Sequence, residues 1–327
     1  MIITVFDIIR FTIFIPSLFL MAFALIIMIS NFFRLNSKFC NEFYPFVAFR
    51  IFNDLMYNIL SFIMLKLPLY GIFGNFFLEN DWVSSIAFLT GASFIGAIFI
   101  HALVLSIIRY IAVKYPTKYR TIFDLKKIVI LIVGMFLFCW SIGIGTLFFP
   151  SYYMYHNQSQ AIVLTYRTND IAYYTFSYGV VIFGVTLILS FIFNVANWIS
   201  IYRRSKKHRK GKHKKDITYA IYTCFSFIMA LMYHGYYILR TIGSYTDKDI
   251  YTTIANISLS YIGDVATLGD FYFVMMISKD LRTLMKKYVV NLFFVRCCFE
   301  RNNQIKTIKE PANISLSRFN NKNKEFY

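Results

Sequence analysis

Seven long apolar stretches dominate the sequence, and most polar residues lie between them. The stretches cover roughly residues 11–33, 44–69, 85–108, 128–148, 171–199, 217–239 and 253–278. Each matches the about 20 residues that a helix needs to cross the hydrocarbon core of a bilayer. Lipid offers no hydrogen-bond partner to an open backbone, so spans of this kind are expected to be helical. The pattern predicts an all-α membrane protein, a seven-transmembrane helix bundle.

Composition supports lipid as the solvent and narrows the function classes. Hydrophobic residues make up 58% of the chain and charged residues 15%, whereas a soluble domain carries roughly 25% charge. The net charge of +18 is spread between the apolar stretches instead of forming one basic face, which argues against nucleic-acid binding. The five cysteines show no disulfide or metal spacing, and no nucleophile–base pattern is present. We therefore expect no enzyme, no metal ion and no cofactor.

The distribution of lysine and arginine predicts the orientation of the bundle. With the N-terminus outside, 28 of the 34 basic residues fall in inner segments. Four fall in outer segments, namely Arg10, Arg167, Arg240 and Lys248, and the other two, Arg50 and Lys66, lie within the second span. Basic residues are retained in the cytosol, so we expect an extracellular N-terminus and a cytoplasmic C-terminus. Residues 1–299 then form the membrane domain, and the polar residues 300–327 form a disordered cytoplasmic tail. Asn157 opens an Asn-Gln-Ser sequon in the second outer loop, where glycosylation is expected.

The inner end of the third span holds the most informative residues. Arg109 closes the span, Tyr110 and an apolar turn follow, and Pro116 ends the segment. This resembles the Asp-Arg-Tyr region of G-protein-coupled receptors, whose arginine alternates between an acidic partner and the G protein. The acid position is Ile108 here, and Asp216 at the start of the sixth span is a candidate interhelical partner. The alternative is an arginine that reaches the interface only as a topology signal.

The wider pattern resembles the nematode serpentine chemoreceptors of the Srg superfamily, either class V (Srv) or class G. Residues 109–113 and 116–119 carry this resemblance, together with 43–44, 67–68 and 278–282. The resemblance implies a sensory receptor that binds a small extracellular molecule and signals through a heterotrimeric G protein. It also implies the plasma membrane of a sensory neuron, with its cilium as a candidate site.

An amphipathic helix is predicted after the seventh span, over about 280–295. Its apolar residues recur at helical spacing: Leu281, Leu284, Met285, Tyr288, Val289, Leu292 and Phe293. Cationic residues lie off this stripe, as in helices that rest in the membrane interface. Cys297 and Cys298 follow directly and are candidates for palmitoylation.

Four ionisable residues within the spans are candidates for a functional polar network, because charge at bilayer depth is costly. These are Arg50, Asp54, Asp264 and Asp270. Asp54 and Asp270 are expected at similar depth, where related receptors hold water or sodium. Arg50 lies four residues before Asp54, so a simple intrahelical ion pair is the alternative. For Asp264, a cationic ligand and a hydrogen bond inside the bundle are both open.

A ligand cavity is expected in the outer half of the bundle. Its candidate lining residues are His101, Tyr233, His234, Tyr237 and Tyr261. For the two histidines, hydrogen bonds between helices are the alternative. For the tyrosines, the alternative is a position in the aromatic belt of the membrane interface.

The basic run at 203–215 is expected to bind anionic lipid of the inner leaflet, and a G-protein contact is compatible with that. Two other functions stay open. One is a peptide or neurotransmitter receptor of the same fold. The other is a transporter or ligand-gated channel, which the lack of internal repeats disfavours.

Overall fold

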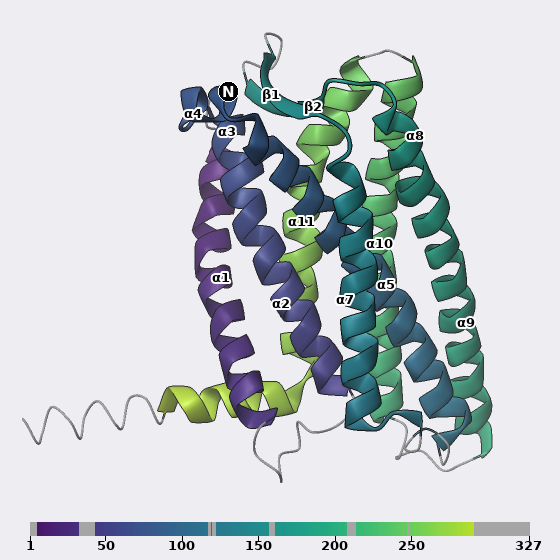
Figure 1. Cartoon of the computed structure of the whole chain (residues 1–327). Helices are drawn as coiled ribbons and strands as arrows, with labels where there is room; N and C mark the ends of the chain where they lie inside the picture. The colour runs from purple at the N-terminus through teal and green to yellow at the C-terminus, as the bar shows by residue number, and fades with distance from the viewer. Residues whose placement is uncertain are drawn as a thin grey trace, which may run out of the picture. The chain divides into compact units, whose positions relative to one another are not determined.

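The computed structural model covers the whole chain and describes residues 5–32, 43–116, 119, 122–156, 161–207, 214–246 and 249–290 (Figure 1). Contacts divide the chain into two compact units, Met1–Ile277 and Ser278–Tyr327. The first unit contains the transmembrane bundle, and the second is described separately below.

Seven helical segments run side by side through the described part of the first unit (Figure 1). In chain order they are α1 (Val5–Phe32); α2 (Phe43–Ser61), continued by a π-helical turn (Phe62–Lys66) and α3 (Leu67–Leu69); α5 (Asp81–Lys114); α7 (Leu125–Thr146); α8 (Ile171–Thr175), a second π-helical turn (Phe176–Ile182) and α9 (Phe183–Lys207); α10 (Lys214–Thr246); and α11 (Asp249–Ile277). The short helix α4 (Gly74–Glu79) precedes α5.

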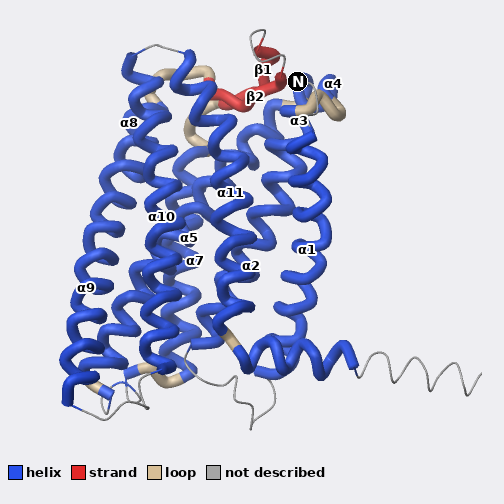
Figure 2. The backbone as a smooth tube through the Cα atoms, turned by 180° about the vertical axis from the view of Figure 1, so that it is seen from behind, coloured by secondary structure: helices blue, strands red, loops and turns tan. Residues whose placement is uncertain are grey.

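Six of these segments are long and apolar enough to cross a membrane. The remaining one, α11, has 29 residues but carries Asp264 and Asp270, which lower its hydropathy. Its length and its place in the bundle match the other spans (Figure 2). The predicted all-α bundle of seven transmembrane helices is confirmed.

One end of the bundle carries a β-hairpin that the sequence analysis did not anticipate. Strands β1 (Ser151–His156) and β2 (Ala161–Tyr166) pair antiparallel, with Ser151 opposite Tyr166 (Figure 2). The strands are rich in tyrosine and β-branched residues, which favour a pleated, half-buried surface. They are too short to span a bilayer, so the lengths of the apolar stretches do not reveal them. We call this end the hairpin end and the opposite end, where α5 stops at Lys114, the basic end.

Helix α5 is the centre of the bundle and packs against α2, α7, α9 and α10. Small residues allow these helices to approach closely, as is common where lipid supplies no hydrophobic drive for association. A Cβ atom added at Gly143 of α7 would lie 2.5 Å from the carbonyl oxygen of Leu89. The α5–α7 contact therefore depends on a residue without a side chain at this position.

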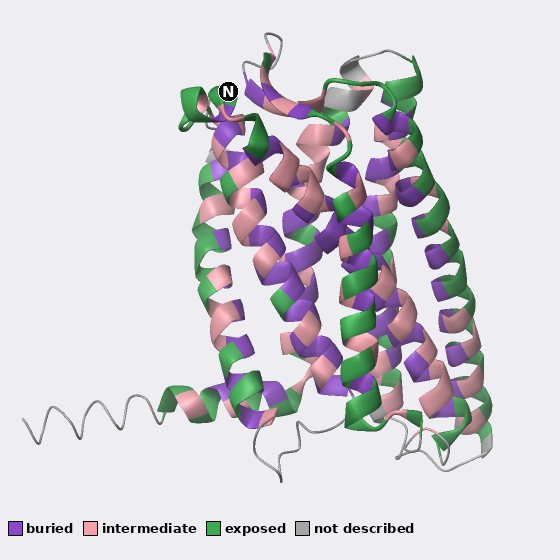
Figure 3. Cartoon of the chain, in the orientation of Figure 1, coloured by how far each residue is buried: buried purple, intermediate pink, exposed green. Residues whose placement is uncertain are grey.

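The outward faces of α1, α7 and α9 are apolar and exposed (Figure 3). Phe19 of α1 is 73% exposed and Ile130 of α7 is 70% exposed. Large apolar side chains in such numbers would be unfavourable in water, and they are the surface expected to contact lipid.

In the second unit, residues 279–290 form a helix. The Ser278 hydroxyl accepts a hydrogen bond from the backbone nitrogen of Leu281 at 3.1 Å, as an N-cap does. The helix lies within the predicted range 280–295, apart from its first residue. Its interfacial position stays a prediction, and residues 291–327, including Cys297, Cys298 and the tail, lie outside the described residues.

Candidate functional site

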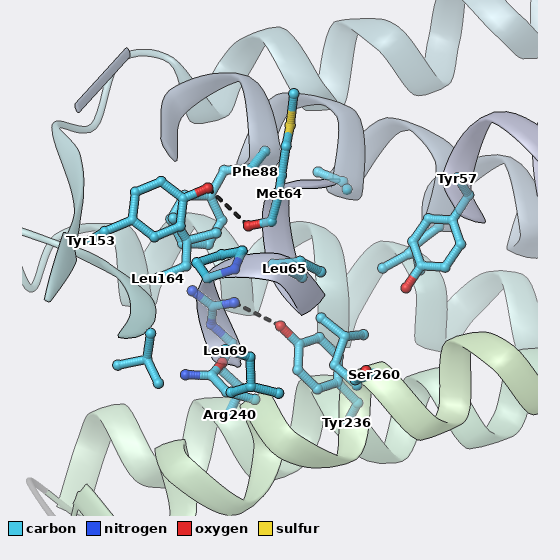
Figure 4. Close-up of a pocket in the computed structure, with 18 of the residues that line it drawn as sticks. Tyr57, Met64, Leu65, Leu69, Phe88, Tyr153, Leu164, Tyr236, Arg240 and Ser260 are labelled. Atoms are coloured by element: carbon cyan, nitrogen blue, oxygen red, sulfur yellow. Dashed lines mark hydrogen bonds between the residues drawn. The ribbon is translucent and has the colours of Figure 1, made fainter. Parts of the chain in front are cut away.

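A cavity lies beneath the hairpin and between the helices at the hairpin end (Figure 4). Its volume is about 80 Å³, several times the roughly 10–15 Å³ that one water needs on the same measure. The walls are mainly apolar and aromatic, with a few polar side chains, a composition typical of sites for small organic ligands. Its polar lining side chains are Tyr57, Tyr153, Tyr178, Tyr236, Tyr237, Arg240, Asn256 and Ser260.

Both π-helical turns border this cavity. Met64 and Leu65 come from the first turn, and Tyr178 comes from the second. A π turn contains an extra residue and changes the regular backbone pairing, which explains its frequent use at functional sites. Here the exposed carbonyls bind side chains. The Tyr153 hydroxyl donates to Met64 O at 2.9 Å, and His234 Nδ1 lies 3.2 Å from Gly179 O.

The hydrogen bond from Tyr153 attaches the hairpin to the second span. Tyr153 is 3% exposed and packs its ring against Phe77, with centroids 5.2 Å apart. Burial raises the pKa of the Tyr153 phenol, so this hydroxyl remains a donor at any physiological pH. The hairpin is thereby held over the cavity as part of its wall.

Arg240 of α10 is the charged residue in the described lining of the cavity. Its Nη1 donates to the Tyr236 hydroxyl at 2.6 Å, as the dashed line in Figure 4 marks. The rings of Phe88 and Tyr166 lie 5.1 and 5.7 Å from the guanidinium carbon. From the sequence, Arg240 is only one of four outer basic residues, because the apolar stretch ends just before it.

Of the five residues expected to line the cavity, Tyr237 does so. Tyr233 lies behind the wall, with its ring 6.3 Å from that of Tyr57. His101 lies elsewhere in the bundle, with Nε2 3.2 Å from the carbonyl oxygen of Phe46.

The other two expected residues also have partners outside the cavity. His234 lies beside Gly179 O, and the Tyr261 ring lies 4.4 Å from the guanidinium carbon of Arg10. Neither of them is among the described lining residues. Helical periodicity places tyrosines and histidines in the outer half of the spans but does not fix which side of each helix faces the cavity.

Asp264 joins three helical segments at the hairpin end through two ion pairs. Arg10 Nε of α1 lies 2.5 Å from Asp264 Oδ2, and Lys66 Nζ of the first π turn lies 2.6 Å from Oδ1. Arg10 also donates to the hydroxyl and carbonyl oxygens of Ser260, both at 2.6 Å. Of the two alternatives for Asp264, a bond inside the bundle matches these contacts. Arg10 and Lys66 lie beside the carboxylate, where a cationic ligand would otherwise bind.

A second ionic cluster lies deeper in the bundle and brings together three predicted network residues. Arg50 Nε lies 2.7 Å from Asp54 and 3.7 Å from Asp270. The hydroxyls of Tyr222 and Ser226 donate to Asp270 at 3.0 and 3.1 Å. The intrahelical Arg50–Asp54 pair is thus present, and it extends to α11.

Arg109 lies at the basic end, where α5 stops. Its guanidinium carbon is 3.8 Å from the ring centroid of Tyr219 and 4.7 Å from that of Phe43. Asp216 comes three residues before Tyr219 on α10, hence on a neighbouring part of the same face. Its pairing with Arg109 stays a prediction. Tyr110 accepts a hydrogen bond from Lys114 Nζ at 2.5 Å, and Pro116 is exposed beyond the helix end.

Comparison with known families agrees with this arrangement. A family model described as serpentine type 7TM GPCR chemoreceptor Srv matches residues 10–293. The chain belongs to the Srv family of serpentine chemoreceptors. Of the two classes that the sequence resembles, the match selects class V. No curated protein matches the chain.

The matched region of this Srv receptor includes both ends of the bundle. Arg240 with the cavity and Arg109 with its two aromatic partners all lie within residues 10–293. The candidate glycosylation site Asn157 is matched as well, but its structure lies outside the described residues.

Proposed function

We propose that this receptor binds a small extracellular molecule in the cavity beneath the hairpin and signals to a heterotrimeric G protein at its basic end. Membership of a chemoreceptor family of G-protein-coupled type supports the proposal. The observation that carries it is the cavity itself, which is apolar, aromatic and located at the end opposite Arg109. The small volume favours a small molecule over a peptide or hormone.

For coupling, we propose Arg109 as the switch residue. Two aromatic rings flank its guanidinium, and the position of the acid beside the arginine is taken by Ile108. A cation–π contact is worth about 2 kcal/mol when desolvated, so a shift of α10 relative to α5 could release the arginine at moderate cost. In this proposal the released Arg109 contacts the G protein, with the hairpin end outside the cell and the basic end in the cytosol.

The test is expression in cells that contain a promiscuous G protein, followed by a screen of small volatile and water-soluble metabolites. Gly91 lines the cavity, and a Cβ atom added there meets nothing within 4 Å, so Gly91→Leu fills the space without a clash at its first atom. We expect Gly91→Leu to abolish the response at unchanged surface expression. Gly134→Leu is the matched control, because Gly134 is exposed on α7 and also has open space around it.

Arg109→Ala is expected to abolish G-protein activation while ligand binding persists. Lys126→Ala is its control, since Lys126 is an exposed cation at the basic end of α7 and lies outside the basic run 203–215. A ligand-evoked current that persists in cells without G protein would refute the proposal and favour a channel. A normal response in Arg109→Ala would remove this residue from the coupling mechanism.

A further inference from the structure

Arg240 is a guanidinium in an aromatic cavity with few partners of its own. It is half-buried, and its hydrogen bond among the described residues goes to the neutral hydroxyl of Tyr236. Phe88 and Tyr166 cover it with their rings and neutralise no charge. Within the described part of the chain, no carboxylate forms an ion pair with it. A cation in such a place is stabilised most by an anion that the protein does not supply.

Three carboxylates at the hairpin end have other partners among the described residues, and neither Glu79 nor Asp170 forms an ion pair with Arg240. Asp264 binds Arg10 and Lys66, and Asp81 pairs with Arg167. Asp7 accepts a hydrogen bond from the Tyr70 hydroxyl at 2.6 Å. None of these contacts leaves an acid directed at Arg240.

The other charges near the cavity balance one another. Arg10 and Lys66 both pair with Asp264, and the buried carboxylate of Asp7 lies three residues before Arg10 on α1. This cluster touches the cavity, because Arg10 donates to the Ser260 hydroxyl and Ser260 is a lining residue. The unbalanced charge in the cavity wall is therefore that of Arg240, and it favours an anionic ligand.

The rest of the cavity suits the body of a small organic molecule. Leu65, Ala92 and Ile95 supply apolar wall. Figure 4 shows Tyr57 at the other side of the cavity from Arg240. The Tyr57 hydroxyl itself is buried. The site thus has one cationic end and mainly apolar and aromatic walls.

A second recess also borders Arg240. It has a volume of about 360 Å³, and its lining includes the neutral polar side chains Thr165, Tyr166, Thr168, Asn169, Thr175 and Ser244 together with Ile171 and Ala172. Arg240 therefore lines both the recess and the inner cavity, and it is the charged residue in the described lining of each.

We propose that the ligands of this cavity are small organic monocarboxylates with an aromatic or short aliphatic body, held by Arg240. The planar guanidinium can donate two parallel hydrogen bonds to one carboxylate, which a neutral ligand cannot match. The inference rests on the proposed function only in taking this cavity as the ligand site.

The test is direct binding to the purified full-length receptor in detergent, without G protein. The probes are benzoate, phenylacetate and hexanoate, each compared with its own primary amide at constant ionic strength. The amide has the same shape but no charge. At least one acid should raise the thermal midpoint of the receptor in a saturable way, with affinity about tenfold or more above that of its amide.

Arg240→Gln should remove this preference for the acid, and Arg240→Lys should keep part of it. Arg167→Gln is the matched control, because Arg167 is an exposed arginine at the same end and should leave the preference unchanged. The proposal is overturned if no acid in the panel binds, if acids and amides bind equally, or if Arg240→Gln binds the acid normally. Should Arg240→Gln fail to fold, the wild-type comparison and Arg240→Lys decide.

These outcomes separate the two proposals. Acid binding without G-protein activation in cells would refute the coupling and leave the carboxylate site intact. Activation by neutral molecules that Arg240→Gln leaves unchanged would support chemoreception and refute the carboxylate site.

Discussion

Replacing Asp264 by asparagine should destabilise the bundle far more than breaking an ion pair at its surface. The substitution leaves Lys66 and Arg10 without their carboxylate, and their side chains are 1% and 8% exposed. Removing one partner of a buried ion pair costs about 3–5 kcal/mol, since the remaining charge cannot be solvated. Ordinary interhelical hydrogen bonds in membrane bundles are worth only about 0.6 kcal/mol on average, so the stranded charge is the larger effect.

The measurement is the apparent thermal midpoint in detergent at one fixed heating rate. At about 2 °C per kcal/mol for a chain of this size, the expected decrease is about 6–10 °C. Asp81→Asn is the control, because Asp81 and Arg167 form an ion pair whose side chains are 48% and 56% exposed. Exposed pairs contribute roughly 0–1 kcal/mol, so this midpoint should change by about 2 °C or less.

A double variant tests the stated cause. Adding Lys66→Met to Asp264→Asn removes one of the two stranded cations and should recover part of the lost midpoint. Equal decreases for Asp264→Asn and Asp81→Asn, or no recovery in the double variant, would refute the reasoning that buried charge dominates here.

Three further substitutions test other parts of the structure. Tyr219→Ala removes the ring nearest to Arg109, a contact worth about 1–2 kcal/mol, and should raise ligand-independent G-protein activation about fivefold or more. Tyr219→Phe keeps a ring and should not raise it; unchanged basal activity in Tyr219→Ala would contradict the proposal that the rings restrain Arg109. Gly143→Ala places a Cβ atom 2.5 Å from the Leu89 carbonyl and should lower surface expression, while Gly134→Ala on the same helix should not. Tyr153→Phe loses its hydrogen bond to Met64 and should lower the midpoint by about 2 °C, for a bond worth about 1 kcal/mol; a larger decrease would mean that the hairpin does more than cover the cavity.

The spans were predictable because bilayer thickness sets a length that the sequence must satisfy with apolar residues. Spacing along one helix was equally informative. Arg50 and Asp54 are four residues apart, so their contact required knowledge of no other helix. Family membership also followed from the order of short motifs, which the match to residues 10–293 confirms.

Contacts between helices were much less predictable. Asp264 was recognised as important, but its partners Arg10 and Lys66 come from other spans, and the apolar pattern does not fix how each helix is rotated. The same uncertainty explains why Tyr237 alone of the expected residues lines the cavity.

Arg240 was missed for a different reason. It lies within α10, which extends to Thr246, although the apolar stretch stops at residue 239. Helices continue past the hydrocarbon core, and a charged residue in that extension is read from the sequence as part of a loop.

The π-helical turn at Phe62–Lys66 affects how the second span can be compared with other receptors. A π turn accommodates one residue more than an α-helical turn, so positions on either side of it differ by one place in any register. If the second span is treated as a regular α-helix numbered from the basic end, Arg50 and Asp54 are placed on the correct helix face. Lys66 and Pro68, at and beyond the π turn, are then assigned to the wrong face. An alignment of this span with a relative that has an uninterrupted α-helix therefore needs a single-residue gap, and without it each cavity residue beyond the turn would be matched to a neighbour.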